Sequence, residues 1–536
     1  YRFMKKTIKK LTAVGLTLTS VMGLVACGSS NDSNAAGGSS SSKEVTKPDK
    51  FTIMCDSTVV TETNGAAAFY EQLKTATGLD FQWTRPDHSG YYDAVANAFN
   101  SDDTMPDVIL LSSDYYALYA SNGFLWNMTD AWNSSETKKS GRLISTADNV
   151  LSALMVNGED GTKAMYGFSP YRGNGCCTYI KKAWLDAAGI STADVEGKTL
   201  DFNTYYGYLK QMAANKGHYV ISAPGFISNE APYTNYLPEF YQQANYTFYK
   251  NSSGQYVDGF SEDKMKEALQ RIQTAVNDGI IDKESVNNST SNARDKFYST
   301  DAGSESGVFT YWAGTWAQTI TDKLANKGWD EGVWELIAIK PIQELGTYVE
   351  RIAPCWCITT AAKNPEGIFK YFIDTMLDGG DVQTLWEYGA KGTHWDTKAE
   401  TVTLAKDDEG KKTKTYEEGQ FHFLPQPESP DKLMSKNHID PILALAKFQD
   451  GKEDPGASAM TETAKANGDF FAENSTVAVP LPMTTALSEN ITDINTARNY
   501  VISQVALGYM TVDEGMNYYK TTVGSLADTV LKSLNK

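Results

Sequence analysis

The sequence predicts an α/β protein with two lobes, and three observations lead to this prediction. Short apolar runs alternate with amphipathic segments from residue 51 onward, the pattern of a parallel sheet covered by helices on both faces. The chain has 536 residues, and one hydrophobic core serves at most roughly 250 to 300 residues. Its hydrophobic content of 41% and aromatic content of 12% indicate packed globular structure.

The N-terminus has the layout of a secretory signal. A basic start is followed by an apolar or small stretch from residue 11 to residue 26. The basic residues are Lys5, Lys6, Lys9 and Lys10. Thr, Gly and Ser interrupt the apolar stretch, which is also shorter than the roughly 20 apolar residues of a spanning helix. We therefore expect an exported protein with a signal peptide over residues 1–26.

A lipid attachment site follows the apolar stretch. The tetrapeptide Leu24, Val25, Ala26 and Cys27 resembles the bacterial lipobox, in which the cysteine thiol is diacylglycerated and becomes the mature N-terminus. Two acyl chains hold a protein stably on a membrane, at roughly 0.8 kcal/mol per buried methylene. Residues 27–50 are mainly small and polar, which predicts a flexible tether. We expect a lipoprotein on the outer face of the bacterial cytoplasmic membrane.

The charge balance excludes one class of partner. The formal net charge is −18, and since Arg2 and the four signal lysines contribute +5, the rest of the chain carries −23. Nucleic-acid binding requires a basic footprint to contact phosphates. We therefore expect no nucleic-acid partner.

Cysteine and histidine spacing gives no metal site. The cysteines after residue 27 are Cys55, Cys176, Cys177, Cys355 and Cys357. Their adjacent and one-apart spacings differ from the gaps of two to four residues in structural zinc sites. The five histidines include no HExxH pair. We expect the cysteines to be small buried hydrophobic residues.

The first five elements alternate regularly. Strands are predicted over 51–55, 81–84 and 107–111, and helices over 65–77 and 91–100. In the first helix, Phe69 and Leu73 fall on one face. This alternation predicts parallel strands.

The rest of the chain is predicted to be mainly helical. Further helices are expected over 182–188, 202–215, 262–278, 316–326, 364–377, 441–449 and 494–506. Residues 401–416 instead show β-forming residues around Asp407, Asp408, Glu409 and Gly410. That pattern predicts a surface hairpin.

The order of the sequence motifs resembles extracellular solute-binding protein family 1, the substrate-binding lipoproteins of ABC importers, and within it the large oligosaccharide-binding type. The matching motifs lie at 105–109, 166–168, 179–185, 279–284 (before a long polar loop), 308–316, 361–366 and 388–395. Each motif alone is weak, but together they span nearly all of the chain after the tether in the family's order.

The resemblance implies a periplasmic-binding-protein-like fold of type II, in which each lobe is a mostly parallel sheet flanked by helices and a hinge joins the lobes. Lobe 1 would comprise residues 51–170 and 352–430, and lobe 2 residues 171–351. Helices in residues 431–536 would pack on both lobes. The chain would cross between lobes near Gly167–Gly173 and Arg351–Cys357.

The same resemblance implies a binder that carries out no reaction. An oligosaccharide would be captured between the lobes of a monomer and delivered to the permease subunits of an importer, with no cofactor. Some relatives hold a structural calcium in an EF-hand-like loop. Neither 407–410 nor 287–295 has the alternating ligands and closing glutamate of such a loop, so a calcium ion is left open.

Aromatic residues are the main candidates for sugar contact, because a pyranose presents a C–H face that stacks on flat rings. Trp312 and Trp316, four residues apart near a helix start, are expected to form one platform. Other candidates lie beside predicted strand ends or crossings, where ligands bind α/β sheets. They are Trp83, Tyr115, Tyr171, Trp356 and Trp395. Large aromatic residues are equally suited to the core, and that alternative stays open for each.

Polar candidates lie at the ends of the predicted strands and at the first crossing. They are Asp56, Ser57, Arg85, His88, Asp114, Arg172 and Asn174. Carboxylate and guanidinium groups can each form paired hydrogen bonds with sugar hydroxyls. Solvated surface is the alternative for each.

Two other functions remain open at the level of sequence. A binding protein for peptides or another polar solute would have the same general layout. A surface glycoside hydrolase would need two paired carboxylates, and the sequence singles out no pair.

Overall fold

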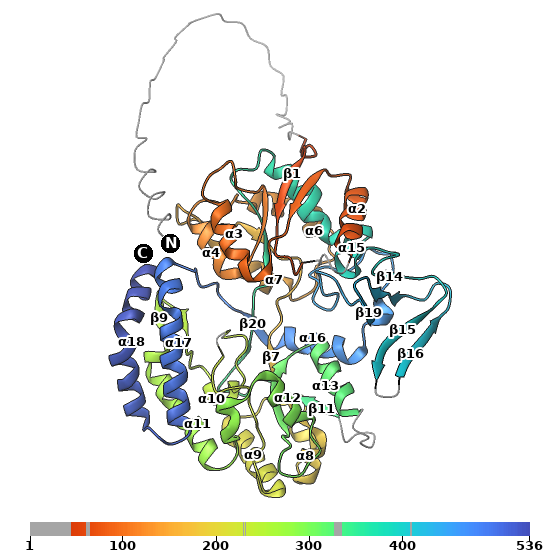
Figure 1. Ribbon diagram of the computed structural model, residues 1–536. Coiled ribbons are helices and arrows are strands. Elements are labelled where there is room, and N and C mark those ends of the chain that lie inside the picture. Colours follow the sequence, from red (N-terminus) through yellow and green to blue (C-terminus); the bar gives the residue numbers. More distant parts are fainter. Residues whose placement is uncertain (1–43, 60–64, 229, 231, 326–334, 408–409) are drawn as a thin grey trace, which may run out of the picture.

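The computed structural model describes residues 44–536 apart from 60–64, 229, 231, 326–334 and 408–409 (Figure 1). The signal peptide, the lipobox with Cys27 and most of the tether lie outside the described residues. Within the described part, no helix has the length and apolar character needed to cross a membrane. Two lobes lie one above the other, and several chain segments pass between them (Figure 1). The predicted α/β class is confirmed.

The first lobe is built on a five-stranded sheet in the order β2-β1-β3-β13-β6. The bounds are β1 Phe51–Met54, β2 Phe81–Thr84, β3 Val108–Leu111, β6 Gly167–Phe168 and β13 Cys355–Ile358. Strand β1 pairs in parallel with β2 and β3, as the sequence predicts, whereas β13 is antiparallel to β3 and β6. The hydrophobic core of the first lobe is formed by buried residues from two parts of the chain, 51–168 and 352–446.

Helices cover this sheet. They are α2 Ala66–Thr77, α3 Tyr91–Ala98, α4 Ser113–Ser121, α5 Thr129–Asn133, α6 Glu136–Lys139, α7 Ala147–Ala153 and α15 Asp381–Tyr388. Two of them, α2 and α3, lie where the sequence predicts. Residues 365–377 are helical throughout but change type, from α14 Pro365–Ile368 to the π-helix η6 Phe369–Ile373 and the 3₁₀-helix η7 Asp374–Leu377. The Asn364 side chain accepts a hydrogen bond from Gly367 N and caps this run.

The second lobe corrects one prediction, because its three-stranded sheet is antiparallel rather than mostly parallel. Its order is β10-β7-β11, with β7 Cys176–Lys181, β10 Val308–Trp312 and β11 Leu336–Ala338. Strand β7 carries the chain away from the crossing, and β10 returns toward it, where Ala313 N donates to Gly175 O at 3.0 Å. The two strands therefore run in opposite directions.

Helices of the second lobe agree with the sequence, with two exceptions. They are α8 Lys182–Ala187, α9 Phe202–Lys216, α10 Pro238–Tyr241, α11 Asp263–Asn277, α12 Thr290–Tyr298 and α13 Thr315–Ala325. Helices α10 and α12 were not predicted, and α12 lies in a segment that we expected to be a long polar loop. A capping box starts it, in which Ser289 accepts from Asn292 N and Asn292 accepts from Ser289 N.

The C-terminal helices correct a second prediction, since α17 Thr485–Ala506 and α18 Val512–Leu534 pack on the second lobe and not on both. Figure 1 shows them beside α11. Their apolar faces share one core with residues 180–342. Helix α16 Glu462–Glu473 packs against α13. Helix α18 has no counterpart among our predictions.

Residues 441–449 do not form the predicted helix. Their backbone pairs with the first lobe: Leu445 N donates to Pro170 O at 3.0 Å, and Leu445 O accepts from Ile144 N at 2.9 Å. The buried Leu445 belongs to the core of the first lobe. These hydrogen bonds take the place of those that a helix would make along itself.

Small two-stranded sheets complete the fold. The predicted surface hairpin is confirmed as β15 Glu400–Asp407 with β16 Gly410–Tyr416. Others are β4 Met155–Asn157 with β5 Lys163–Met165, β8 Phe248–Lys250 with β9 Tyr256–Asp258, β14 Trp395–Asp396 with β17 His422–Phe423, and β18 Pro425–Gln426 with β19 Ser429–Leu433.

Two adjacent chain segments cross between the lobes at 169–175 and 351–354. Strand β12 Tyr348–Glu350, which leads into the second crossing, pairs in parallel with β20 Ser475–Val477. Gly173 lies against Arg351 so closely that a Cβ would collide with the Arg351 carbonyl oxygen. The crossings are therefore packed against each other at a position that only glycine fits.

Candidate ligand-binding cleft

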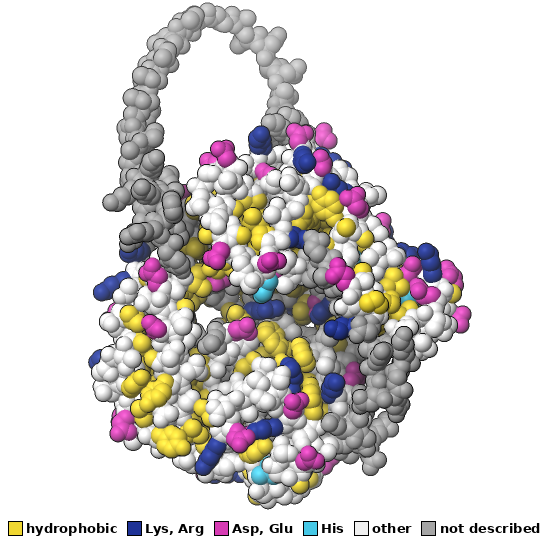
Figure 2. All heavy atoms as spheres, in the orientation of Figure 1, with side chains coloured by type: hydrophobic (Ala, Val, Ile, Leu, Met, Phe, Trp, Pro, Cys, Tyr) yellow, Lys and Arg dark blue, Asp and Glu magenta, His cyan; other side chains and the backbone are white. Residues whose placement is uncertain are grey.

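A hollow separates the two lobes in Figure 2, with hydrophobic and basic side chains along its lower edge. The end of β3 lies on the side of the first lobe that faces the second. Asp114, three residues after this strand, accepts from Met483 N through its carbonyl at 3.2 Å. Its charge also contributes to raising the pKa of Tyr233 in the second lobe, after burial and the charge of Glu230. The predicted site at the carboxyl ends of the strands therefore faces the second lobe.

On the first lobe, the structure brings together Asp56 and His88. His88 Nδ1 lies 2.6 Å from Asp56 Oδ2, and the imidazole is exposed. Burial by itself would raise the pKa of Asp56, but hydrogen bonds from Thr58 and His88 lower it overall. Ser57 follows directly and donates its backbone N–H to Pro86 O at 3.1 Å. This corner presents a fixed carboxylate beside an accessible ring nitrogen.

Tyr115 lies in a stacked pair at the start of α4. Its ring is 3.8 Å from that of Tyr92, with an interplanar angle of 9°. The Tyr92 hydroxyl donates to Ser112 Oγ at 2.7 Å, and Ser112 Oγ donates to Asp114 Oδ1 at 2.5 Å. Tyr115 and Asp114 are thus held by one network of side chains.

On the second lobe, Trp312 ends strand β10 at the crossing. Its ring is partly exposed, and the guanidinium carbon of Arg351 lies 5.1 Å from the ring centroid. Arg351 Nε donates to Gly173 O at 2.7 Å, so the guanidinium is tied to both crossings. This arrangement is a cation–π contact that fixes one face of the indole.

Trp316 contacts a different arginine from Trp312, namely Arg294. The Arg294 guanidinium carbon lies 5.1 Å from the Trp316 ring and 5.6 Å from the Tyr311 ring. Arg294 Nη1 donates to the Tyr311 hydroxyl at 2.6 Å. Trp312 is a strand residue and Trp316 belongs to α13, so the i, i+4 geometry of a helix does not apply to them.

The first crossing contains two further predicted residues. Asn174 has a φ of 64°, and its Nδ2 donates to Ala313 O at 3.1 Å. Tyr171 lies edge-on to His438 with ring centroids 5.4 Å apart. Burial raises the pKa of Tyr171 to about 12. Asn174 therefore ties the crossing to the end of the strand that carries Trp312.

Two predicted contact residues are structural instead. Trp356 is fully buried on β13, and its Nε1 donates to His438 Nε2 at 3.1 Å. Arg172 is 2% exposed and forms an ion pair with the buried Glu350. Both side chains are buried, Trp356 on its strand and Arg172 at the crossing, so a ligand in the cleft does not reach them.

The remaining predicted residues lie elsewhere in the first lobe. Trp83 is partly buried and donates from Nε1 to Cys55 Sγ at 3.0 Å. Arg85 donates to Val59 O at 3.3 Å. Trp395 is 5% exposed and stacks on Phe421. It lines a groove of about 690 Å³ between α2 and α15. Arg85 and Trp83 instead lie next to the Asp56 corner, because their partners Val59 and Cys55 flank Asp56 in the chain.

Arg294 and Arg351 were not predicted. Arg351 lies at the expected second crossing, beside the aromatic end of a strand. That position was the signal from which it could have been predicted as a site residue. Arg294 falls in the segment that we expected to be a loop, where no side-chain direction could be assigned.

The described cysteines are all buried and form no disulfide. Burial raises the pKa of Cys55 and of Cys355 to about 12. Within the described ranges, no group of three or more His, Cys, Asp and Glu side chains could hold a metal ion.

No family model and no curated protein matches the sequence. Solved structures match its fold. An extracellular solute-binding protein family 1 member from Alicyclobacillus acidocaldarius superposes with a TM-score of 0.55 at 12% identity, covering 91% of this chain and 100% of that one. An N-glycan transport solute-binding protein from Streptococcus pneumoniae gives 0.53 at 15%, covering 91% and 98%.

A third similar structure is a solute-binding protein associated with an ABC transporter that binds HMO, from Bifidobacterium longum infantis. It gives a TM-score of 0.53 at 13% identity, covering 91% of this chain and 98% of that chain. All three alignments extend over both lobes. The chain therefore has the two-lobed fold of the family 1 extracellular solute-binding proteins.

Proposed function

We propose that this protein is a membrane-anchored lipoprotein that captures an oligosaccharide between its two lobes and delivers it to the permease subunits of an ABC importer. It acts as a monomer and without a cofactor. The similar structures include proteins named for N-glycan transport and HMO binding, which supports a carbohydrate ligand.

The observation that carries this proposal is Trp312 at the crossing. Arg351 and the second lobe cover part of its ring, and the residue is partly exposed at the end of β10. A pyranose can stack its C–H face on such a ring while its hydroxyls reach polar groups. The Asp56 carboxylate and His88 on the opposite lobe offer an acceptor and a ring nitrogen for those hydroxyls.

Closure follows from where these groups lie. A glycan held by Trp312 on one lobe and by the Asp56 corner on the other binds both only when the lobes approach each other. A ligand shifts a conformational equilibrium only by binding one state more tightly. The glycan therefore favours the closed form, which is the form offered to the importer.

The membrane anchor rests on the lipobox. A Cys27→Ser variant cannot receive the diacylglycerol group, so we expect it to appear in the culture medium while the parent protein stays with the membrane fraction. Equal membrane retention of both would contradict the lipid anchor.

A thermal scan with and without a calcium chelator tests whether the protein holds a structural calcium ion, and an unchanged unfolding midpoint is expected.

The ligand is tested by a thermal-shift screen of residues 44–536 against oligosaccharides, with di- and tripeptides alongside. A ligand at 100 times its dissociation constant adds about 2.7 kcal/mol to the stability of the folded state. A shift with one glycan series, with the glycan recovered uncut, is expected. Shifts with peptides alone would indicate a peptide-binding protein, and a cleaved glycan would indicate a glycoside hydrolase.

A further inference from the structure

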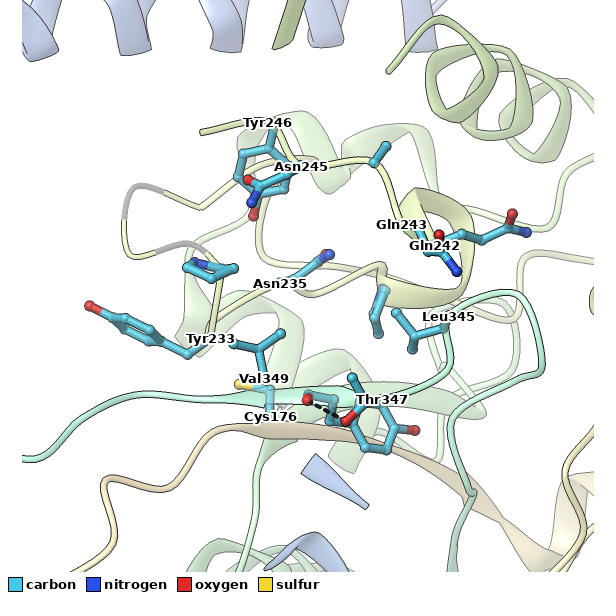
Figure 3. A pocket seen from close by; sticks show the side chains of 14 residues that line it. Cys176, Tyr233, Asn235, Gln242, Gln243, Asn245, Tyr246, Leu345, Thr347 and Val349 are labelled. Atoms are coloured by element: carbon cyan, nitrogen blue, oxygen red, sulfur yellow. Dashed lines mark hydrogen bonds between the residues drawn. The ribbon is translucent and has the colours of Figure 1, made fainter. Parts of the chain in front are cut away.

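A pocket of about 280 Å³ lies in the second lobe between residues 232–246 and strand β12 (Figure 3). None of the described residues that line it is charged. Apolar walls come from Pro232, Pro238, Leu345 and Val349, and the polar side chains of the lining include four amides, three tyrosines and Thr347. This volume is slightly below the roughly 300 to 1,000 Å³ of pockets for drug-sized ligands, which suits a single ring.

The amide groups of two asparagines are held by their own turns. Asn235 Oδ1 accepts from Leu237 N at 3.0 Å, and Asn245 Oδ1 accepts from Thr247 N at 3.0 Å. The NH₂ groups of Asn235 and Asn245 make no hydrogen bond to the described residues. Figure 3 shows Asn235 reaching into the middle of the pocket. Both side chains therefore have a fixed orientation and donors available to a ligand.

The backbone at the pocket is strained. Gln242, which ends helix α10, has φ 54° and ψ −121°, a conformation that residues other than glycine rarely adopt. Its N–H donates to Pro238 O at 2.7 Å. Such strain persists where the surrounding structure over-determines it, and it concentrates at binding sites.

The pocket adjoins the ligand-binding cleft. Cys176, which contributes to its lining, is the strand partner of Trp312 in the β7–β10 pair. Val349 of the lining is two residues before Arg351. Tyr233, which also lines the pocket, is uncharged, and the charge of Asp114 across the cleft contributes to raising its pKa. The pocket therefore lies next to the end of strand β10 that carries Trp312.

We propose that this pocket binds one uncharged monosaccharide unit at the end of the oligosaccharide that stacks on Trp312. The inference rests on the proposed function. Sugar hydroxyls both donate and accept, which matches amides and tyrosine hydroxyls between apolar walls. A uronate or a peptide terminus would bring a charge into a pocket whose described lining holds no charged side chain to pair with it directly, and burying an unpaired charge is strongly unfavourable.

The test uses the glycan found by the screen, together with the same glycan shortened by one terminal unit. Asn235→Asp keeps the acceptor for Leu237 N but replaces the donor with a negative charge. Asn251→Asp is the matched control, because Asn251 Oδ1 likewise accepts from Ser253 N at 3.0 Å, in an exposed turn outside the pocket. Affinities are measured by calorimetry for the parent protein and both variants.

The expected result is that the parent protein binds the longer glycan at least about tenfold more tightly than the shorter one. A difference of this size corresponds to the free energy of one or two hydrogen bonds. Asn235→Asp should remove this difference and leave the affinity for the shorter glycan unchanged, while Asn251→Asp retains it. Equal loss for both glycans, or no loss for either, overturns the pocket assignment but leaves the proposed function standing. Failure of the parent protein to bind any glycan overturns both.

Discussion

Removing the indole of Trp312 is the substitution that bears most directly on the ligand. Truncation of a buried aromatic at a binding interface costs about 2 to 4 kcal/mol. Arg351 and the second lobe already cover part of this ring, so less of it remains to be buried by a ligand. We therefore expect the lower value, about 2 kcal/mol, which corresponds to roughly 30-fold weaker binding.

Calorimetric titration of Trp312→Ala with the glycan identified by thermal shift measures this loss. Trp312→Phe should recover part of the affinity, because it restores a flat apolar ring. Trp395→Ala is the matched control, since its ring is 5% exposed and stacks on Phe421. It should unfold more easily but keep its affinity. Unchanged glycan affinity in a folded Trp312→Ala protein would refute the assignment.

Three further predictions concern buried polar groups and thiols. Arg172→Ala leaves the Glu350 carboxylate buried without its partner, so urea unfolding should show a loss of about 3 to 5 kcal/mol; a loss under about 1 kcal/mol would contradict a buried pair. Burial raises the pKa of Glu239 from 4.5 to about 7, so its folded form holds the proton more tightly than the unfolded chain does. Stability should therefore fall as pH rises from about 4.5 to 7, and Glu239→Gln should remove about 3 kcal/mol of that fall. An unaltered pH profile in the variant would refute it. Because Cys55 and the other described cysteines are buried, a thiol reagent should react only after denaturation; fast labelling of the native domain would show otherwise.

Local pattern was enough to predict the start of the fold. Apolar runs such as Val108–Leu111 and faces such as that of α2 have one clear period, so strand, helix and parallel pairing followed directly. Residues 441–449 show the limit. Their composition favours a helix, but their backbone bonds to Ile144 and Pro170, which are far away in sequence. Such long-range pairing overrides local propensity.

The candidate site was predictable only as positions along the chain. Sequence placed Asp56 and His88 after predicted strands and Trp312 near a helix start, and the structure puts each beside a partner. The sequence could not distinguish the partly exposed Trp312 from the fully buried Trp356. Both lie among aromatic and other β-forming residues, and they differ only in how far the surrounding fold covers them. The Arg351 contact likewise depends on two crossings packing together.

Capture between two closing lobes is the central claim, and small-angle X-ray scattering of residues 44–536 with and without the bound glycan tests it most directly. The account predicts a smaller radius of gyration with the glycan, with less closure in Trp312→Ala at the same glycan concentration. An identical scattering profile at a glycan concentration that calorimetry shows to be saturating would contradict the claim.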